Sequence, residues 1–419
     1  MPPSARRERR SRGVLPRRSP VEWGVRIALA LVAAWLGWMS VTHSLALSLR
    51  TNAPARAYAL APWDARVAAT YSATLAGPEA TPAQRVEADE IARAALRRDP
   101  TAVAAVATLG INAAIREDVG EARRLFAYSE MLSRRDLRTR LWAIEDAVAR
   151  DDVPGVLRNY DIALRTSRVA PDLLYPVLST AIADPAIQVE LARTLAGRPA
   201  WTEGFVGYVA GTGDPQAVAA LFGRLAQVRV PIPVAARAGV IARLVAAGED
   251  DEAWAYYAAT TRGADRRTSR DPRFTAGLEQ PSAFDWTPVQ DGGATATIQR
   301  GEDGGLVDFS APATIGGPLV TQRQLLPPGR YVIEGRSAGI EQAPVARPFW
   351  QLSCSDGREL GRVTLPNSAD AGGRFAGPVT VPADCPVQVL TLMARPSSEI
   401  GGLFGQIEEA RIRPATAAR

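Results

Sequence analysis

A single apolar run near the N-terminus determines where the rest of this chain can fold. Residues 27–47, IALALVAAWLGWMSVTHSLAL, contain no charged side chain apart from the titratable His43. About 20 apolar residues, rising about 1.5 Å each, span the hydrocarbon core of a bilayer. The run therefore predicts a transmembrane helix over residues 27–48, with everything that follows confined to one side of a membrane.

Charge on the two sides of this run predicts its orientation. Residues 1–26 carry eight arginines against two glutamates, a net charge of +6, whereas the segment after the run has only Arg50 and Arg56. Positively charged flanks are retained in the cytoplasm. We therefore expect residues 1–26 to be a basic cytoplasmic tail and the bulk of the chain, from about residue 50, to be exported.

A cleaved signal peptide is the alternative to an anchor. Ser44-Leu45-Ala46 offers small residues at a cleavage position. An apolar core near 20 residues is longer than the 7–15 of most signal peptides, however, which favours an uncleaved anchor. Both alternatives place the body of the protein outside the cytoplasm, and the sequence leaves cleavage open.

Composition argues against several classes of function. Outside residues 1–26 the chain has 41 arginines and 42 acids, and no folded segment is strongly basic, so no nucleic-acid partner is expected. His43 is the only histidine and lies in the apolar run, which excludes a Ser-His-Asp or Cys-His site in the exported body. Metal ligands are similarly scarce, and the DGG and EDGG segments are typical of turns rather than of a phosphate-binding loop. We expect no metal, no cofactor and no enzymatic activity.

One enzymatic alternative survives these arguments. A glycosidase needs only two suitably spaced carboxylates. Acids in the last third of the chain supply candidates, namely Asp285, Asp308, Glu334, Asp356 and Glu408. The sequence does not determine the distances between these carboxyl groups in the fold.

The two cysteines, Cys354 and Cys385, predict a disulfide. In an oxidising compartment, two cysteines within one small domain are typical of a disulfide bond. A zinc site would need further cysteine or histidine ligands, and a redox pair more often has C-x-x-C spacing. We expect the bond to join strands of an exported domain.

Composition and periodicity in the rest of the chain predict a multidomain α + β protein. Residues 50–260 are rich in alanine with apolar residues at helical spacing. Residues 261–282 carry five arginines and two prolines without a period, typical of a linker or of a loop lying on the next domain. Across residues 283–415, glycine and proline separate eight or nine short alternating runs, which predicts an antiparallel, jelly-roll-like β-sandwich.

The helical region resembles the tetratricopeptide repeat, a helix–turn–helix unit of 34 residues. Frames at 69–102, 103–136 and 137–170 superpose small and apolar residues at equivalent positions, and the middle frame matches best, with Gly110, Ala122, Phe126 and Ser129. The segment LVAAGEDDEAWAYY (244–257) looks like a further repeat edge, with Ala253 and Tyr257 in the second helix. The resemblance implies a curved solenoid that binds a partner protein, although a helical spacer fits equally well.

The C-terminal region resembles β-sandwiches of the carbohydrate-binding-module type. More narrowly, it is similar to tetratricopeptide-containing membrane proteins of polysaccharide-producing proteobacteria. The matching motifs are FDW (284–286), LPPGRY (326–331), WQLSC (350–354) and VPADCP (381–386). The resemblance implies a bacterial inner-membrane protein with a periplasmic bulk and a role near exopolysaccharide or other surface-glycan assembly.

Candidate ligand-binding residues follow from the alternation of side chains along FWQLSC. Trp350, Leu352 and Cys354 share the face expected to be core, which leaves Phe349 and Gln351 on the other. Sugars stack on exposed aromatic rings flanked by polar groups. The sequence-derived site is therefore Phe349 and Gln351 with Glu334 and Arg336 of a neighbouring strand, and with Trp286. The alternative is that the aromatic residues are core and the charged ones an ordinary solvated face.

Three hypotheses result for function. The first is a non-catalytic, single-pass accessory or scaffold protein in surface-glycan assembly, whose sandwich binds polysaccharide or a glycan-handling partner. The second is a purely protein-binding envelope scaffold. The third is a glycan-modifying enzyme. An exposed aromatic strip among polar groups would favour the first, and a large apolar patch the second.

Overall fold

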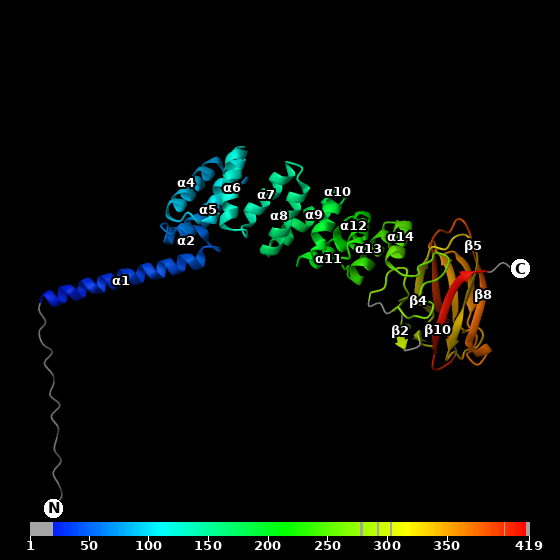
Figure 1. Cartoon of the computed structure of the whole chain (residues 1–419). Coiled ribbons are helices and arrows are strands. Elements are labelled where there is room, and N and C mark those ends of the chain that lie inside the picture. Colours follow the sequence, from blue (N-terminus) through cyan, green and yellow to red (C-terminus); the bar gives the residue numbers. More distant parts are fainter. Residues whose placement is uncertain (1–19, 277–279, 291–292, 302–303, 398, 416–419) are drawn as a thin grey trace, which may run out of the picture. The chain divides into compact units, whose positions relative to one another are not determined.

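The computed structural model describes residues 20–276, 280–290, 293–301, 304–397 and 399–415. Most of the predicted basic tail therefore lies outside the described residues. The chain divides into two compact units, the first ending at Asp151 and the second running from Asp152. Figure 1 shows helices in both units and a β-sandwich at the C-terminal end of the second.

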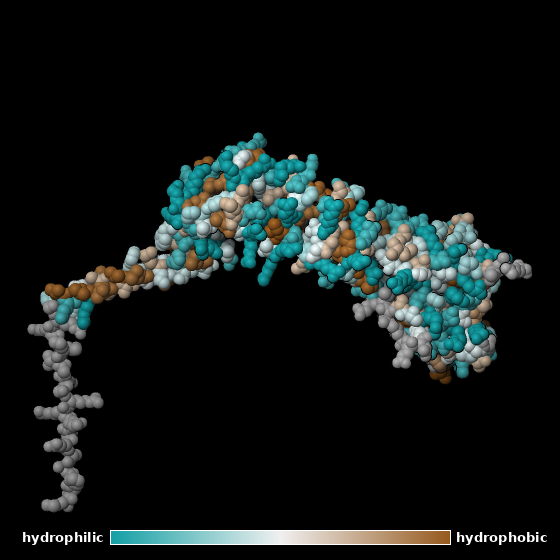
Figure 2. Space-filling view, in the orientation of Figure 1, coloured by the Kyte–Doolittle hydropathy of each residue, from teal (hydrophilic) through white to brown (hydrophobic). Residues whose placement is uncertain are grey.

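Helix α1 (Pro20–Leu49) contains the predicted membrane span. It is long and apolar enough to cross a membrane, and no residue of its most apolar window is buried; Figure 2 shows apolar side chains along it. The last turns differ, because Ala46 is fully buried and packs against Ala57, Ala61 and Val67. These residues belong to α2 (Pro54–Leu60), the turn after it and α3 (Ala65–Ser72). The end of α1 is thus part of a small folded core.

Eleven further helices follow in the described residues. Their bounds are α4 (Pro82–Arg98), α5 (Val103–Ile115), α6 (Val119–Leu132), α7 (Leu137–Val148), α8 (Val153–Thr166), α9 (Ala170–Ala181), α10 (Pro185–Ala196), α11 (Thr202–Thr212), α12 (Pro215–Gln227), α13 (Val234–Ala246) and α14 (Asp250–Thr260). From α5 onward they form pairs whose first helices begin at residues 103, 137, 170, 202 and 234. A two-helix unit therefore recurs every 32 to 34 residues.

Aspartates fix where many of these helices begin. Asp118, Asp136, Asp152, Asp184 and Asp214 each precede a helix and accept a hydrogen bond from a backbone N–H of its first turn. Such a cap satisfies one of the otherwise unpaired N–H groups and is worth about 1 kcal/mol. These recurring capping aspartates therefore produce short helices separated by short turns.

Helix packing repeats with the same period. In the second unit α8 contacts α10, α10 contacts α12, α9 contacts α11 and α11 contacts α13. In the first unit α5 packs against α6, where Gly110 faces the ring of Phe126 so closely that a Cβ would lie 2.9 Å from it. Phe126 in turn stacks on Trp142, with ring centroids 4.4 Å apart. Gly110 therefore permits the close approach of paired helices.

The β-sandwich consists of two five-stranded antiparallel sheets. One has the order β1-β4-β9-β6-β7 and the other β2-β3-β10-β5-β8. The strands are β1 (Thr287–Pro288), β2 (Thr295–Gly301), β3 (Gly304–Ala311), β4 (Gly317–Gln324), β5 (Gly329–Ala338), β6 (Phe349–Cys354), β7 (Glu359–Thr364), β8 (Arg374–Val381), β9 (Gln388–Ala394) and β10 (Leu403–Pro414). Alternate residues of both sheets face a shared core.

The core confirms the predicted inward face of β6. Trp350 and Leu352 are fully buried, and Trp350 is the largest side chain among the fully buried residues described. Cys354 is bonded to Cys385, 31 residues later, with 5.7 Å between the Cα atoms. The predicted disulfide is thus present and ties the end of β6 to the loop before β9.

The segment predicted to be a linker or a loop on the next domain lies on the sandwich. The backbone N–H of Ser269 donates to the carbonyl of Ile412, whose own N–H donates to the Ser269 hydroxyl. Phe274 is buried in the sandwich core against the ring of Trp286. This part of residues 261–282 therefore adds to the sandwich instead of acting as a free tether.

Candidate functional site

The structure places Trp286 in the core of the sandwich. Only 4% of its surface is exposed, and its ring lies 5.4 Å from that of Phe274 and 5.5 Å from that of Trp350. Its indole N–H donates to the backbone carbonyl of Asp271 at 2.9 Å. Both faces of the indole are therefore occupied by protein, which leaves no surface for a sugar ring to stack on.

Phe349 and Gln351 lie on the outer face of β6, as alternation predicts, but the ring of Phe349 is covered. The guanidinium carbons of Arg362 and Arg395 lie 5.1 and 4.5 Å from its centroid. Arg362 is held by both carboxylate oxygens of Glu359. Only 7% of the surface of Phe349 is exposed. Its ring therefore makes cation–π contacts with two arginines and is not open to a sugar.

Glu334 and Arg336 lie on β5, which belongs to the other sheet. Both point outward, because Ile333 and Ser337, which flank the pair, are buried on the inward face. The two outer faces of a sandwich are on opposite sides of its core, so the structure does not bring Glu334 and Arg336 together with Phe349 and Gln351. Alternation along a strand predicts the outward direction of each side chain but not the sheet to which its strand belongs.

Glu334 is the centre of an ion-pair network. One of its carboxylate oxygens accepts from Arg411 at 2.5 Å and from Arg413 at 2.8 Å, and the other accepts from Arg413 at 2.7 Å. The hydrogen bonds from Arg413, with a further contribution from Arg411, hold the pKa of Glu334 below its usual value despite its partial burial. Arg336 pairs with Glu408.

This network predicts a pH-dependent contribution to stability. A carboxyl group with a pKa lowered by folding stabilises the protein above its unfolded-state pKa, and this contribution is lost as pH falls through the folded-state pKa. We expect Glu334→Gln to lower the melting temperature of the full-length protein at pH 7 by a few degrees, corresponding to about 1 kcal/mol. The difference from wild type should shrink as pH falls below the ordinary pKa of a glutamate, about 4.3.

The matched control for this prediction is Glu399→Gln, at an exposed glutamate of the same sandwich for which no ion pair is recorded among the described residues. Its melting temperature should follow that of wild type at every pH, as measured by differential scanning calorimetry. A pH-independent deficit in Glu334→Gln would contradict the assigned network.

The sheet that carries Glu334 also holds the exposed aromatic residue of the sandwich that sequence analysis missed. Phe404, on β10, is 57% exposed. It lies directly opposite Ser310 on β3, which is opposite Thr295 on β2. In the next outward row Gln406 donates to Asp308 at 3.1 Å. We call Phe404, Gln406, Asp308, Ser310 and Thr295 the Phe404 face.

The Phe404 face has an aromatic ring beside side-chain donors and acceptors. The Thr295 and Ser310 hydroxyls lie 3.0 Å apart and both groups are exposed, so they remain open to further hydrogen bonds. Arg336 lies on the same outer face, one strand beyond β10. Alternation in LFGQI, with Leu403 and Ile407 inward, was the signal that would have placed Phe404 and Gln406 outward.

Metal-ligating side chains do not cluster in the parts of the chain that the structure describes. No group of three or more histidine, cysteine, aspartate or glutamate side chains is arranged to hold an ion there. Asp285, one of the acids considered for catalysis, accepts hydrogen bonds from Tyr257, Arg270 and Ser282. Its carboxylate oxygens are therefore already engaged by the protein.

Comparisons with known proteins find similarity at the level of solved structures only. No protein-family model matches the chain, and no curated protein matches it. A CBM4 carbohydrate-binding module aligns over 35% of this chain and 99% of its own, at 13% identity and a TM-score of 0.26. The enzymatically active domain of tailspike protein 4 from bacteriophage CBA120 aligns over 32% of this chain at 17% identity and a TM-score of 0.23.

A glycosylation associate protein complex from Streptococcus agalactiae aligns over 29% of this chain, at 16% identity and a TM-score of 0.20. This chain spans 20% of the length of the tailspike chain and 39% of that streptococcal chain.

Proposed function

We propose that this protein is a non-catalytic, single-pass membrane accessory protein of surface-glycan assembly, and that its sandwich binds glycan through the Phe404 face. The observation that carries the proposal is the exposed ring of Phe404 among outward hydroxyl, amide and carboxylate groups. A pyranose can place its apolar C–H face on the ring while its hydroxyls exchange hydrogen bonds with Gln406, Asp308 and Ser310. Backbone pairing of β2, β3 and β10 fixes the spacing of these groups.

A retained anchor is part of the proposal. Cleavage after Ala46 would remove Ala46, which is buried against the residues that follow the span. Removing Ala46 would open a cavity in a core that consists of only a few alanines and a valine. With the basic tail in the cytoplasm, the sandwich would face the periplasm of a bacterial cell.

The helical region is proposed to be a tetratricopeptide-like solenoid that binds a partner protein. Support comes from the two-helix period of 32 to 34 residues and from the contact of Gly110 with Phe126. In such solenoids each two-helix repeat packs only on the neighbouring repeats, and the same surface recurs along the array. The arm would place the glycan-binding sandwich within reach of the assembly machinery.

Glycan binding is tested with full-length protein in detergent. The probes are cellohexaose, chitohexaose, a galacturonate hexamer and the purified surface polysaccharide of the host, each titrated calorimetrically. We expect saturable binding of at least one probe. Phe404→Ala should weaken it about tenfold or more, because covering an exposed phenylalanine ring is worth about 1.5 kcal/mol or more.

The matched control removes an exposed aromatic side chain elsewhere. Trp63, in the first unit, is 48% exposed, so Trp63→Ala should leave affinity unchanged. Asp308→Asn tests the polar part of the face and should weaken binding without changing the melting temperature. Absence of binding to all four probes, or equal weakening in Phe404→Ala and Trp63→Ala, would refute glycan binding at this face and favour a protein-binding sandwich.

A further inference from the structure

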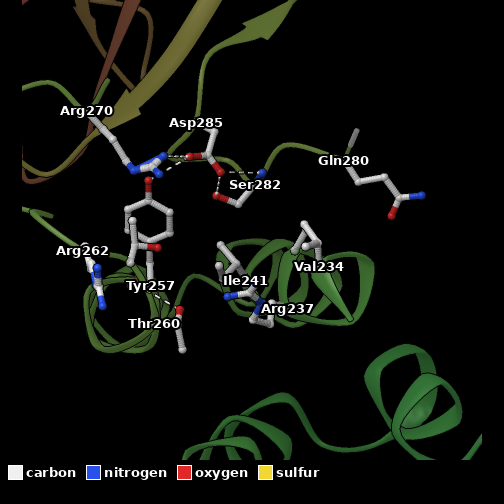
Figure 3. Close-up of a pocket in the computed structure, with 12 residues that line it drawn as sticks. Val234, Arg237, Ile241, Tyr257, Thr260, Arg262, Arg270, Gln280, Ser282 and Asp285 are labelled. Carbon is white, nitrogen blue, oxygen red and sulfur yellow. Dashed lines mark hydrogen bonds and ion pairs between the residues drawn. The ribbon is translucent and has the colours of Figure 1, made fainter. Parts of the chain in front are cut away.

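A pocket of about 200 Å³ lies within the second unit, away from the Phe404 face. Its walls are α13, α14 and the segment that leads from α14 into the sandwich. Figure 3 shows Arg270, Asp285 and Ser282 on one wall and Arg237, from α13, on the opposite wall. Arg262 and Gln280 also line it. The pocket therefore has three arginines and one acid in its lining.

The single acid of the pocket is fully engaged. Asp285 Oδ1 accepts from the Tyr257 hydroxyl at 2.8 Å and from Arg270. Asp285 Oδ2 accepts from the backbone N–H of Ser282 at 3.0 Å and from the Ser282 hydroxyl at 2.7 Å. Burial, with the nearby charge of Asp285, raises the pKa of Tyr257, so its hydroxyl stays a donor at neutral pH. This carboxylate has little capacity left to neutralise Arg237 or Arg262.

Arg237 is the unusual cation of this pocket. Its Nε is buried and has no hydrogen-bond partner among the described residues. The ion pairs recorded for the described residues likewise include none to Arg237 or to Arg262. Arg237 therefore lines the pocket without a counter-charge from the described residues, and an anion in the pocket would supply one.

We propose that the pocket binds a small oxyanion, a carboxylate or phosphate group, through Arg237 and Arg262. A guanidinium group presents N–H donors in a planar fork that matches the oxygens of both groups. A volume of about 200 Å³ has room for one anionic group with a small substituent. The ligand would bridge α13 and the segment that enters the sandwich.

The test measures anion binding to full-length protein in detergent by isothermal titration calorimetry. The probes are inorganic phosphate and glucuronate, with methyl glucoside as a neutral control. We expect at least one anion to bind and the neutral sugar not to bind at this site. Arg237→Gln should weaken anion binding by about tenfold to a hundredfold, since a hydrogen bond to a charged group is worth about 1.5–3 kcal/mol. Preference for phosphate or for glucuronate identifies which source of the oxyanion the pocket takes.

The matched control is Arg243→Gln, which removes a half-buried arginine from the same helix outside the pocket and should leave anion binding unchanged. Arg262→Gln gives a second test at an exposed position if Arg237→Gln lowers the melting temperature. Phe404→Ala should retain anion binding, which separates this site from the proposed glycan face. Absence of binding by both anions, or equal weakening by Arg237→Gln and Arg243→Gln, would overturn the proposal.

Discussion

Replacing Asp285 by asparagine is expected to destabilise the second unit by about 3–5 kcal/mol. The carboxylate is 6% exposed and accepts four hydrogen bonds, two at each oxygen. An asparagine side chain has one acceptor and one NH₂ donor group in this space. In either orientation its NH₂ group faces the Ser282 N–H or the Arg270 guanidinium, so a donor opposes a donor and Arg270 loses its counter-charge.

The expected consequence extends to the junction between α14 and the sandwich. Tyr257 of α14 donates to Asp285, and its ring packs against Phe284, with centroids 5.2 Å apart. We therefore expect Asp285→Asn to lower the melting temperature of full-length protein by several degrees. Hydrogen exchange should also increase in α14.

Asp251→Asn is the matched control for this substitution. Asp251 belongs to the same helix as Tyr257, but its side chain is 78% exposed and pairs with Arg266 at the surface. Exposed pairs of this kind contribute at most about 1 kcal/mol. Equal losses in Asp285→Asn and Asp251→Asn would show that Asp285 is not the centre of the junction.

Much of the sandwich could be predicted because neighbouring residues determine where a strand forms and which of its side chains face inward. Alternation along FWQLSC placed Trp350 and Leu352 inward, and both are fully buried. Glycine and proline between alternating runs predicted eight or nine strands, since turns need the backbone angles that these residues provide. The described residues form ten, one of which is the two-residue β1. The apolar run predicted α1. The two cysteines predicted the disulfide, because an exported domain is expected to fold in an oxidising compartment.

The site could not be predicted to the same degree, because it depends on which strands become neighbours. β5 pairs with β8 and β10, whereas β6 pairs with β7 and β9, so Glu334 and Phe349 occupy different sheets. Phe404 meets Ser310 across more than ninety positions of sequence. Asp285 in the FDW motif meets Tyr257 28 residues earlier. Such pairings are set by the packing of the whole domain, and no local period encodes them.

Removing the disulfide is the second large effect that we expect. Cys354 and Cys385 close a loop of 31 residues, and the loop-closure model assigns about 3–4 kcal/mol to such a link through the entropy of the unfolded chain. The double substitution Cys354→Ser/Cys385→Ser should therefore lower the melting temperature of the sandwich by several degrees. Both cysteines are at most 4% exposed, so burial of the two hydroxyl groups would add to the loss.

A reducing agent supplies the control. Reduction of wild-type protein at a temperature that makes the bond accessible should lower its melting temperature toward that of the double variant, which the reductant should not affect. The same bond reports on location, since disulfides persist in the periplasm and are rare in the cytosol. Alkylation in intact cells should leave both thiols of wild-type protein unlabelled. Rapid labelling of Cys354 and Cys385 would contradict an oxidised bond and, with it, the argument that the basic N-terminal flank keeps the sandwich outside the cytoplasm.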